Sequence, residues 1–240
     1  MFKLKNKKTV KTYYTILKSP VFRIVEAYKT LRTNILFSIP AVENRSKRFL
    51  FTSANPGDGK STVSVNTAIT FAQQTDVKVL IIDADLRKAT IHKYFSLSAK
   101  KGLSNFLAGH SELEECIQKV PETDNLFLLA SGVLPPNPSE LLSGKQLDIL
   151  FSKLDSMFDV IIIDSPPVNV VADSLSLCPY ADGVVIVATD NKTSYSEVQD
   201  AVKQLKIADA KILGIVLNRA RQSNYRSRQK YSNYYRSIEE

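Results

Sequence analysis

Six short runs of apolar residues recur along the chain, and each is almost continuous rather than alternating with polar residues. Strands that are buried on both faces of a parallel sheet have this pattern, because helices cover the sheet on each side. The pattern predicts strands at residues 49–52, 79–83, 126–130, 160–164, 183–188 and 212–218.

The segments between these runs have the length and apolar spacing of helices. Repeated strand and helix units indicate an α/β fold, with a doubly wound, mostly parallel sheet and helices on both faces. In such folds, ligands bind at the carboxyl ends of the strands. The sequence predicts helices at residues 62–74, 103–119, 143–157 and 195–208, and an amphipathic helix within residues 20–38, before the first strand.

The positive charge of the chain is concentrated at its two ends. The formal net charge is +8 over 240 residues. Residues 1–48 hold 12 basic and 2 acidic residues and residues 219–240 hold 6 and 2, so the segment between them carries −6. We therefore expect a basic N-terminal tail (1–19), one α/β domain that includes the N-terminal helix (20–219) and a tyrosine-rich C-terminal tail (220–240).

The lysines of the N-terminal tail could bind anionic lipid, or they could belong to a solvated, disordered segment. No apolar run approaches the roughly 20 residues that a membrane-spanning helix needs. Cys116 and Cys178 are far apart and lack the spacing of metal ligands or a redox pair, so we interpret them as buried thiols. These observations together predict a cytoplasmic protein.

A glycine-rich turn follows the first predicted strand. The sequence ANPGDGKST at residues 54–62 places glycine, lysine and hydroxyl side chains at the offsets of the phosphate-binding P-loop, G-x-x-x-x-G-K-[ST]. Ala54 replaces the first glycine, so the turn must form there without a positive φ. An ordinary glycine-rich turn is the alternative, but the flanking strand and helix favour a nucleotide site. Its predicted residues are Pro56, Gly57, Asp58, Gly59, Lys60, Ser61 and Thr62.

Acidic residues stand where two of the predicted strands end. Asp83 and Asp85 follow the apolar run at 79–83, and Asp164 ends the run at 160–164. In a P-loop protein such carboxylates can hold Mg²⁺ beside the loop hydroxyl. A second nearby carboxylate can orient an attacking hydroxyl and accept its proton, so Asp83 or Asp85 is the candidate base. An isolated D-x-D could also be a turn or a helix cap.

Three of these motifs together resemble the bacterial tyrosine kinases, the BY-kinase family linked to capsule and exopolysaccharide synthesis. ANPGDGKST, VLIIDADLRK and VIIIDSPP resemble its Walker A, Walker A′ and Walker B motifs, and the likeness extends over residues 20–240. The resemblance implies a stand-alone, ATP-dependent and Mg²⁺-dependent protein-tyrosine kinase. Its catalytic residues would be Lys60, Asp83, Asp85 and Asp164, with Ser61 also at the metal. The phosphate acceptors would be Tyr225, Tyr231, Tyr234 and Tyr235.

The resemblance also implies partners. In the family, an E-x-x-R-x-x-R helix packs subunits into a ring, and this chain has Glu26, Lys29 and Arg32 at these positions. Lysine keeps the charge but lacks the planar fork of arginine. A membrane-embedded activator that serves as polysaccharide co-polymerase, a phosphotyrosine phosphatase and a peripheral position at the inner face of the membrane are implied as well, with no specific nucleic acid. Asn218 and Arg219 are candidates for the adenine pocket because they follow the last strand.

A second hypothesis keeps the fold but changes the function. Partition and septum-placement ATPases are nucleotide-switched proteins that bind membrane or DNA without tyrosine chemistry. They usually carry a second lysine in the Walker A loop, where this chain has Asn55. Asp85, Arg87 and the tyrosine tail distinguish the kinase hypothesis from this alternative.

Overall fold

The described residues form a seven-stranded sheet in the strand order β3-β4-β2-β5-β1-β6-β7. This is a computed structural model, which describes residues 13–40 and 45–220. All neighbouring strands run parallel except β3 and β4. The strands are β1 (Lys47–Ser53), β2 (Val79–Asp83), β3 (Ile117–Lys119), β4 (Leu126–Leu129), β5 (Val160–Asp164), β6 (Gly183–Thr189) and β7 (Ile212–Asn218).

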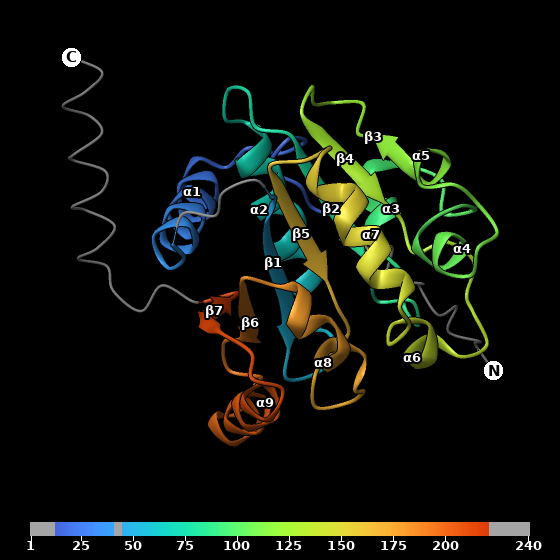
Figure 1. Cartoon of the computed structure of the whole chain (residues 1–240). Coiled ribbons are helices and arrows are strands. Elements are labelled where there is room, and N and C mark those ends of the chain that lie inside the picture. Colours follow the sequence, from blue (N-terminus) through green and yellow to red (C-terminus); the bar gives the residue numbers. More distant parts are fainter. Residues whose placement is uncertain (1–12, 41–44, 221–240) are drawn as a thin grey trace, which may run out of the picture.

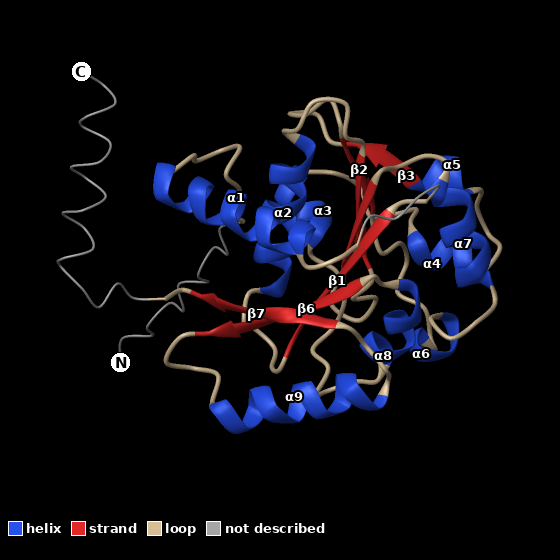
Figure 2. Ribbon diagram, turned by 60° about the vertical axis from the view of Figure 1, so that its left-hand side comes forward, coloured by secondary structure: helices blue, strands red, loops and turns tan. Residues whose placement is uncertain are grey.

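Helices cover both faces of this sheet (Figures 1 and 2). One apolar core joins the sheet to α1, α2 and α3, and a second core joins its other face to α4, α5, α7, α8 and α9. The doubly wound α/β architecture predicted from the sequence is therefore confirmed. The helices are α1 (Phe22–Phe37), α2 (Lys60–Ala72), α3 (Ile91–Phe95), α4 (Leu103–Leu107), α5 (Leu113–Cys116), α6 (Pro138–Leu141), α7 (Gln146–Asp155), α8 (Asp173–Leu177) and α9 (Tyr195–Ile207).

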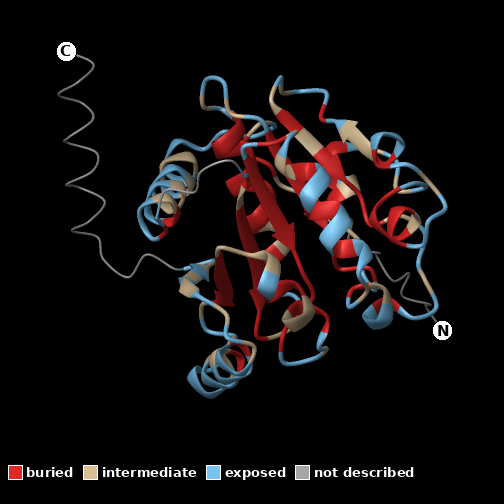
Figure 3. Ribbon diagram, viewed as in Figure 1, coloured by how far each residue is buried: buried red, intermediate tan, exposed pale blue. Residues whose placement is uncertain are grey.

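Burial explains why the central strands have continuous apolar runs. Every residue of β2, β5 and β6 is buried, as are six of the seven residues of β1 (Figure 3). Burial of one such side chain contributes about 1.5–3 kcal/mol relative to leaving it in water. Strand β7 differs because it forms one edge of the sheet, and none of its residues is fully buried.

The segment 103–119 corrects one prediction. The sequence pattern indicated a single helix there, but the structure has α4, α5 and the edge strand β3. Gly109, with φ +73°, follows α4 in a left-handed conformation that breaks the helix. Strand β3 then pairs antiparallel with β4, with Ile117 opposite Leu129. Antiparallel pairing with the next strand along the chain outweighs local helical spacing here. The short helices α3, α6 and α8 were likewise absent from the prediction.

The predicted amphipathic helix is α1, and it packs against α2. Its inward residue Ile35 is buried. Arg32 donates from Nη1 to the Thr70 carbonyl at 2.6 Å, whereas Lys29 and Glu26 form an exposed pair at 2.8 Å. The oligomer interface predicted for these three charged residues stays a prediction.

Residues 13–19, the last part of the predicted basic tail, pack against α2. Ile16 is buried and its N–H donates to Asn66 Oδ1 at 2.8 Å. The lysines at 3–11 and the four candidate phosphate-acceptor tyrosines lie outside the described residues. Within residues 13–40 and 45–220, no helix combines the length and apolar character needed to cross a bilayer.

Candidate active site

The P-loop lies between the carboxyl end of β1 and the start of α2. Gly57 and Gly59 adopt the left-handed region, with φ of +81° and +87°. Ala54 is buried and is not among the described residues with positive φ, so the loop turns without a glycine there, as expected. A Cβ on Gly59 would lie 2.1 Å from the side-chain nitrogen of Asn218. The positive φ, together with this close approach, explains why glycine suits the second glycine position of the motif.

A cavity of about 300 Å³ opens beside this loop. It collects most of the predicted nucleotide-site residues, and Arg219 from the end of β7 joins them. Asn218 instead donates from Nδ2 to the Asp58 carbonyl at 3.0 Å and so supports the loop from behind. The residues that line the cavity are Pro56, Gly57, Gly59, Lys60, Ser61, Thr62, Asp85, Arg87, Lys88, Thr90, Tyr94, Pro166, Pro167, Val170, Val171 and Arg219.

Asp58 is the exception among the predicted P-loop residues. Its buried carboxylate accepts the Asn55 N–H at 3.0 Å and the Thr193 hydroxyl at 3.0 Å. The side chain therefore holds the shape of the loop and does not face the cavity. Sequence reasoning missed this role because Thr193 lies 135 residues away in the chain.

The predicted catalytic side chains meet at the carboxyl ends of β2 and β5. Lys60 Nζ lies 2.9 Å from Asp85 Oδ2 and 3.4 Å from Asp164 Oδ2. The Ser61 hydroxyl donates to Asp164 Oδ2 at 2.6 Å. Asp83 stands directly beside Asp164 in the register of the two strands. The sheet thus brings together residues from three separate motifs.

Burial and mutual repulsion shape the charges of this cluster. Asp83 is fully buried, and burial together with the charge of Asp164 raises its pKa to about 7, although N–H groups of Ile91 and Thr90 donate to its Oδ2. Burial also raises the pKa of Asp164. Burial opposes the charge of Lys60, but the attraction of Asp164 and Asp85 is stronger and holds its pKa above the ordinary value. Lys60 is therefore a fixed cation among carboxylates.

We expect Asp83→Asn to stabilise the nucleotide-free protein above neutral pH. Between an unfolded pKa of about 3.9 and the folded pKa of about 7, the folded state holds a proton on Asp83 that the unfolded state releases. Stability of the natural protein should therefore fall as pH rises through this window. Asparagine removes that dependence, so the gain in melting temperature should grow from about pH 5 to 7 and be constant above about pH 8.

Thermal unfolding at a series of pH values checks this expectation, with the exposed Asp124→Asn as the matched control. A gain that is the same at every pH would contradict the raised pKa. The variant should also lose kinase activity.

Two further contacts in the cavity wall involve residues that were not predicted from the sequence, Asp173 and Tyr94. Arg87 donates from Nε to Asp173 Oδ2 at 2.9 Å and from Nη2 to the Ser139 hydroxyl at 2.8 Å. Asp173 is fully buried at the start of α8, so it fixes the guanidinium in the wall of the cavity. The Tyr94 and Thr62 hydroxyls lie 2.7 Å apart. The D-x-D-x-R pattern marked Arg87, but no local pattern marked Asp173 or Tyr94.

The oxygen groups of this site fit a magnesium ion that is shared with a nucleotide. Among residues 13–40 and 45–220, no group of three or more His, Cys, Asp or Glu side chains could hold a metal alone. Mg²⁺ usually takes one or two carboxylates, a hydroxyl, waters and substrate phosphates. Ser61 and Asp164 supply such a pair, and Asp83 Oδ1 is buried without a hydrogen-bond partner beside them.

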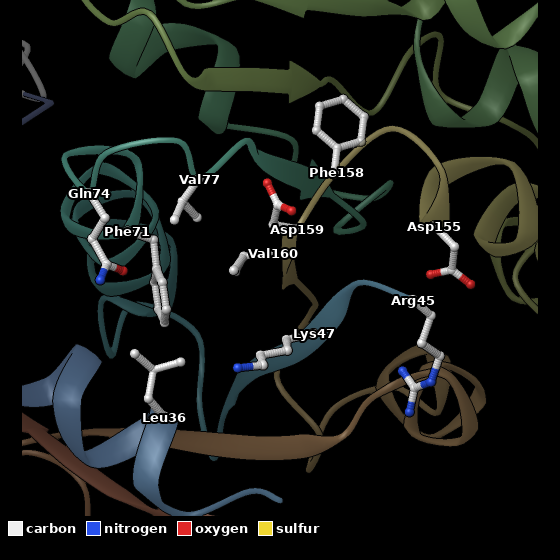
Figure 4. Close-up of a pocket in the computed structure, with 10 residues that line it drawn as sticks. All are labelled: Leu36, Arg45, Lys47, Phe71, Gln74, Val77, Asp155, Phe158, Asp159 and Val160. Atoms are coloured by element: carbon white, nitrogen blue, oxygen red, sulfur yellow. The ribbon is translucent and has the colours of Figure 1, made fainter. Parts of the chain in front are cut away.

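A second cavity, of about 580 Å³, lies at the opposite ends of the strands from the P-loop (Figure 4). Lys47 begins β1 there, Val160 begins β5, Phe71 lies in the last turn of α2, and Gln74 follows that helix. It therefore lies at the amino ends of the strands, away from the P-loop. Ligands of open α/β sheets bind at the carboxyl ends, so we assign the nucleotide site to the smaller cavity.

The chain is similar to known proteins in both sequence and structure. Residues 48–215 match the model of the AAA domain family. The chain is 42% identical over 193 residues to the tyrosine-protein kinase YwqD of Bacillus subtilis, covering 80% of each protein. It is 38% identical over 215 residues to the putative tyrosine-protein kinase CapB of Staphylococcus aureus, covering 90% of this chain and 92% of CapB. The kinase domain of Escherichia coli tyrosine kinase ETK superposes with a TM-score of 0.79 at 33% identity, covering 87% of this chain and 82% of that one. The chain therefore belongs to the bacterial tyrosine kinase family and is a protein-tyrosine kinase with the P-loop NTPase fold.

Proposed function

We propose that this kinase uses Mg-ATP to phosphorylate the tyrosines of its own C-terminal tail, and so regulates the synthesis and export of capsular or extracellular polysaccharide. The observation that carries the proposal is the cluster of Lys60, Ser61, Asp85 and Asp164 at the P-loop. Phosphoryl transfer needs a cation at the phosphates, oxygen ligands for Mg²⁺ and a carboxylate near the attacking hydroxyl. The cluster supplies all three.

Each residue has a role in this proposal. Lys60 would bind the β- and γ-phosphates, and Ser61, Asp83 and Asp164 would hold Mg²⁺, which would supply neutralising charge at the transferring phosphate. Asp85 orients the tyrosine hydroxyl and accepts its proton as the new O–P bond forms and the bond to the leaving ADP breaks. Asp85 suits this role better than Asp83 because Asp85 lines the cavity, whereas Asp83 is fully buried and is not among the residues that line it.

The position of β7 supports the tail as substrate. Arg219, directly after this strand, lines the cavity, so residues 221–240 continue from the edge of the nucleotide site. An extended chain covers at most about 3.3–3.6 Å per residue. Tyr225 to Tyr235 thus have a reach of roughly 20 to 55 Å from Arg219, enough for the chain's own site or that of a neighbour.

The proposal includes partners. Glu26, Lys29 and Arg32 on α1 would contact a neighbouring subunit in a ring of unphosphorylated chains, and Glu26 and Lys29 are accessible for this. A membrane-embedded co-polymerase would activate the kinase and hold it at the inner face of the membrane, and a phosphotyrosine phosphatase would reverse the reaction. This part of the proposal rests on the resemblance to the family.

Intact-mass spectrometry after incubation with Mg-ATP tests the proposal. We expect the full chain to gain up to four phosphates, each adding about −1.5 to −2 charge at neutral pH. A variant with Tyr225, Tyr231, Tyr234 and Tyr235 all changed to Phe should gain none, because phenylalanine has no hydroxyl to accept the phosphoryl group. Each protein is measured with and without a cytoplasmic peptide of the candidate activator.

A matched control changes Tyr195 to Phe, because Tyr195 is a highly exposed tyrosine on α9 outside the tail. This variant should gain as much mass as the natural chain. Equal phosphorylation of the four-Phe variant would show that the acceptors lie elsewhere. Release of ADP without added mass would contradict the autokinase function itself.

A further inference from the structure

The loop between β6 and α9 contacts the P-loop, although it belongs to no nucleotide-binding motif. It begins after Thr189, and Ser194 starts α9 by accepting the N–H of Glu197. Asn191 in its middle has φ +55°, in the left-handed region that asparagine tolerates better than most residues. This tight turn places the side chains of Lys192 and Thr193 against the outer side of the P-loop.

Lys192 joins both ends of the Pro56-Gly57-Asp58 turn. Its ammonium donates to the Pro56 carbonyl at 3.0 Å and lies 3.2 Å from Asp58 Oδ1. It passes over Gly57 so closely that a Cβ there would lie 3.2 Å from Nζ. One cation thus fixes a backbone carbonyl and a carboxylate on either side of a flexible glycine.

Lys192 supplies a cation to a carboxylate that is buried. The Asp58 side chain is fully buried. The other groups that donate to its carboxylate, the backbone N–H of Asn55 and the Thr193 hydroxyl, are neutral. A buried carboxylate is costly unless it is paired and hydrogen-bonded. Within the described ranges, Lys192 is the residue that forms an ion pair with it.

The same loop also fixes the backbone of Asp58. The Thr189 hydroxyl donates to the Asp58 carbonyl at 3.0 Å, and Thr193 Oγ1 accepts the Thr189 N–H at 2.9 Å while donating to the Asp58 carboxylate. The P-loop and the β6–α9 loop are therefore one hydrogen-bonded unit. In that unit Lys192 carries the positive charge, and its side chain remains 47% exposed.

We propose that Lys192 is a positioning residue for nucleotide binding, which acts through Pro56 and Asp58 to hold the N–H groups of the P-loop toward the phosphates. Preorganised N–H groups bind an anion without the cost of ordering the loop first. The cation does not line the cavity, so it acts through the loop and not by touching the nucleotide. This inference rests on the ATP binding proposed above.

The test is titration of the full chain with Mg-ATP, by calorimetry or with a fluorescent ATP analogue, followed by kinase assays. Lys192→Met should raise the Kd for ATP about tenfold, since charge-assisted hydrogen bonds are among the strongest. The rate at saturating ATP should change by less than about threefold, because binding and not chemistry is affected. Lys192→Arg keeps the cation and should restore affinity to within about threefold of the natural protein.

Two comparisons separate positioning from a general structural role. Lys203→Met, at an exposed lysine of α9 paired with Asp200, should leave the Kd unchanged. Asp58→Asn combined with Lys192→Met should weaken ATP binding less than the sum of the two single changes, because both act on one contact.

Unchanged ATP affinity in Lys192→Met, or strictly additive effects in the double variant, would overturn the inference while leaving the proposed function intact. A lower melting temperature with normal affinity in the folded Lys192→Met protein would overturn it in the same way. Failure of the natural protein to bind ATP at all would overturn the proposed function and this inference together.

Discussion

Replacement of Lys60 by methionine is expected to reduce autophosphorylation by about 10²–10³-fold, the range found when one electrostatic contact to a transition state is removed. Lys60 pairs with the carboxylate cluster, 2.9 Å from Asp85 and 3.4 Å from Asp164. Without it, these carboxylates repel one another and also repel the nucleotide phosphates. The rate of phosphate incorporation, measured by intact mass, and the affinity for ATP should therefore both fall.

The matched control is Lys88→Met. Lys88 also lines the cavity, and its backbone N–H donates to Asp85 Oδ1 at 3.0 Å, but among the described residues its ammonium forms no ion pair with a carboxylate. Loss of this ammonium should therefore cost less than about tenfold, through weaker general attraction of phosphate. Equal losses in the two variants would show that net positive charge matters more than the position of Lys60. A thermal melt of each variant establishes that the protein is folded before rates are compared.

The second large effect is expected for Asp164→Asn. Asp164 is fully buried, its Oδ2 accepts from Ser61, and its Oδ1 accepts from Ser64 at 3.2 Å. Asparagine keeps the size of the side chain but removes the negative charge that pairs with Lys60 and that, in the proposed function, supports Mg²⁺. We expect kinase activity or Mg²⁺ affinity to fall at least about 10–100-fold, as when a supporting metal contact is lost.

Mg²⁺ dependence of the rate distinguishes the cause of this loss. If Asp164 acts through the metal, high Mg²⁺ should recover part of the activity of Asp164→Asn, whereas the exposed control Asp124→Asn should behave as the natural protein at every Mg²⁺ concentration. A loss that Mg²⁺ does not relieve, in a variant that still binds ATP, would place the role of Asp164 in the orientation of Lys60 and Ser61 instead.

Most of the candidate site could be predicted because its chemistry is local in sequence. The P-loop residues are consecutive, and Asp83 and Asp164 directly follow apolar runs. Once those runs form neighbouring parallel strands, their carboxyl ends must meet at one edge of the sheet. The pairing of Asp83 with Asp164 in the register of β2 and β5 is the direct result.

The sequence alone also determined the α/β fold. Continuous apolar runs of strand length alternate with segments of helical apolar spacing, and both are local patterns that follow from backbone geometry. Only the tertiary structure decided that Asp58 turns inward, that Lys192 pairs with it across 134 residues and that Asp173 holds Arg87 across 86. The tertiary structure also shows that residues 117–119, which the sequence pattern predicted as helix, form an edge strand. Asp58, Lys192 and Asp173 act through single side chains that join segments distant in sequence, and such contacts leave no periodic pattern in the chain. Strand β3 is only three residues long and pairs with the strand that follows it, so its own sequence is too short to distinguish it from a helix.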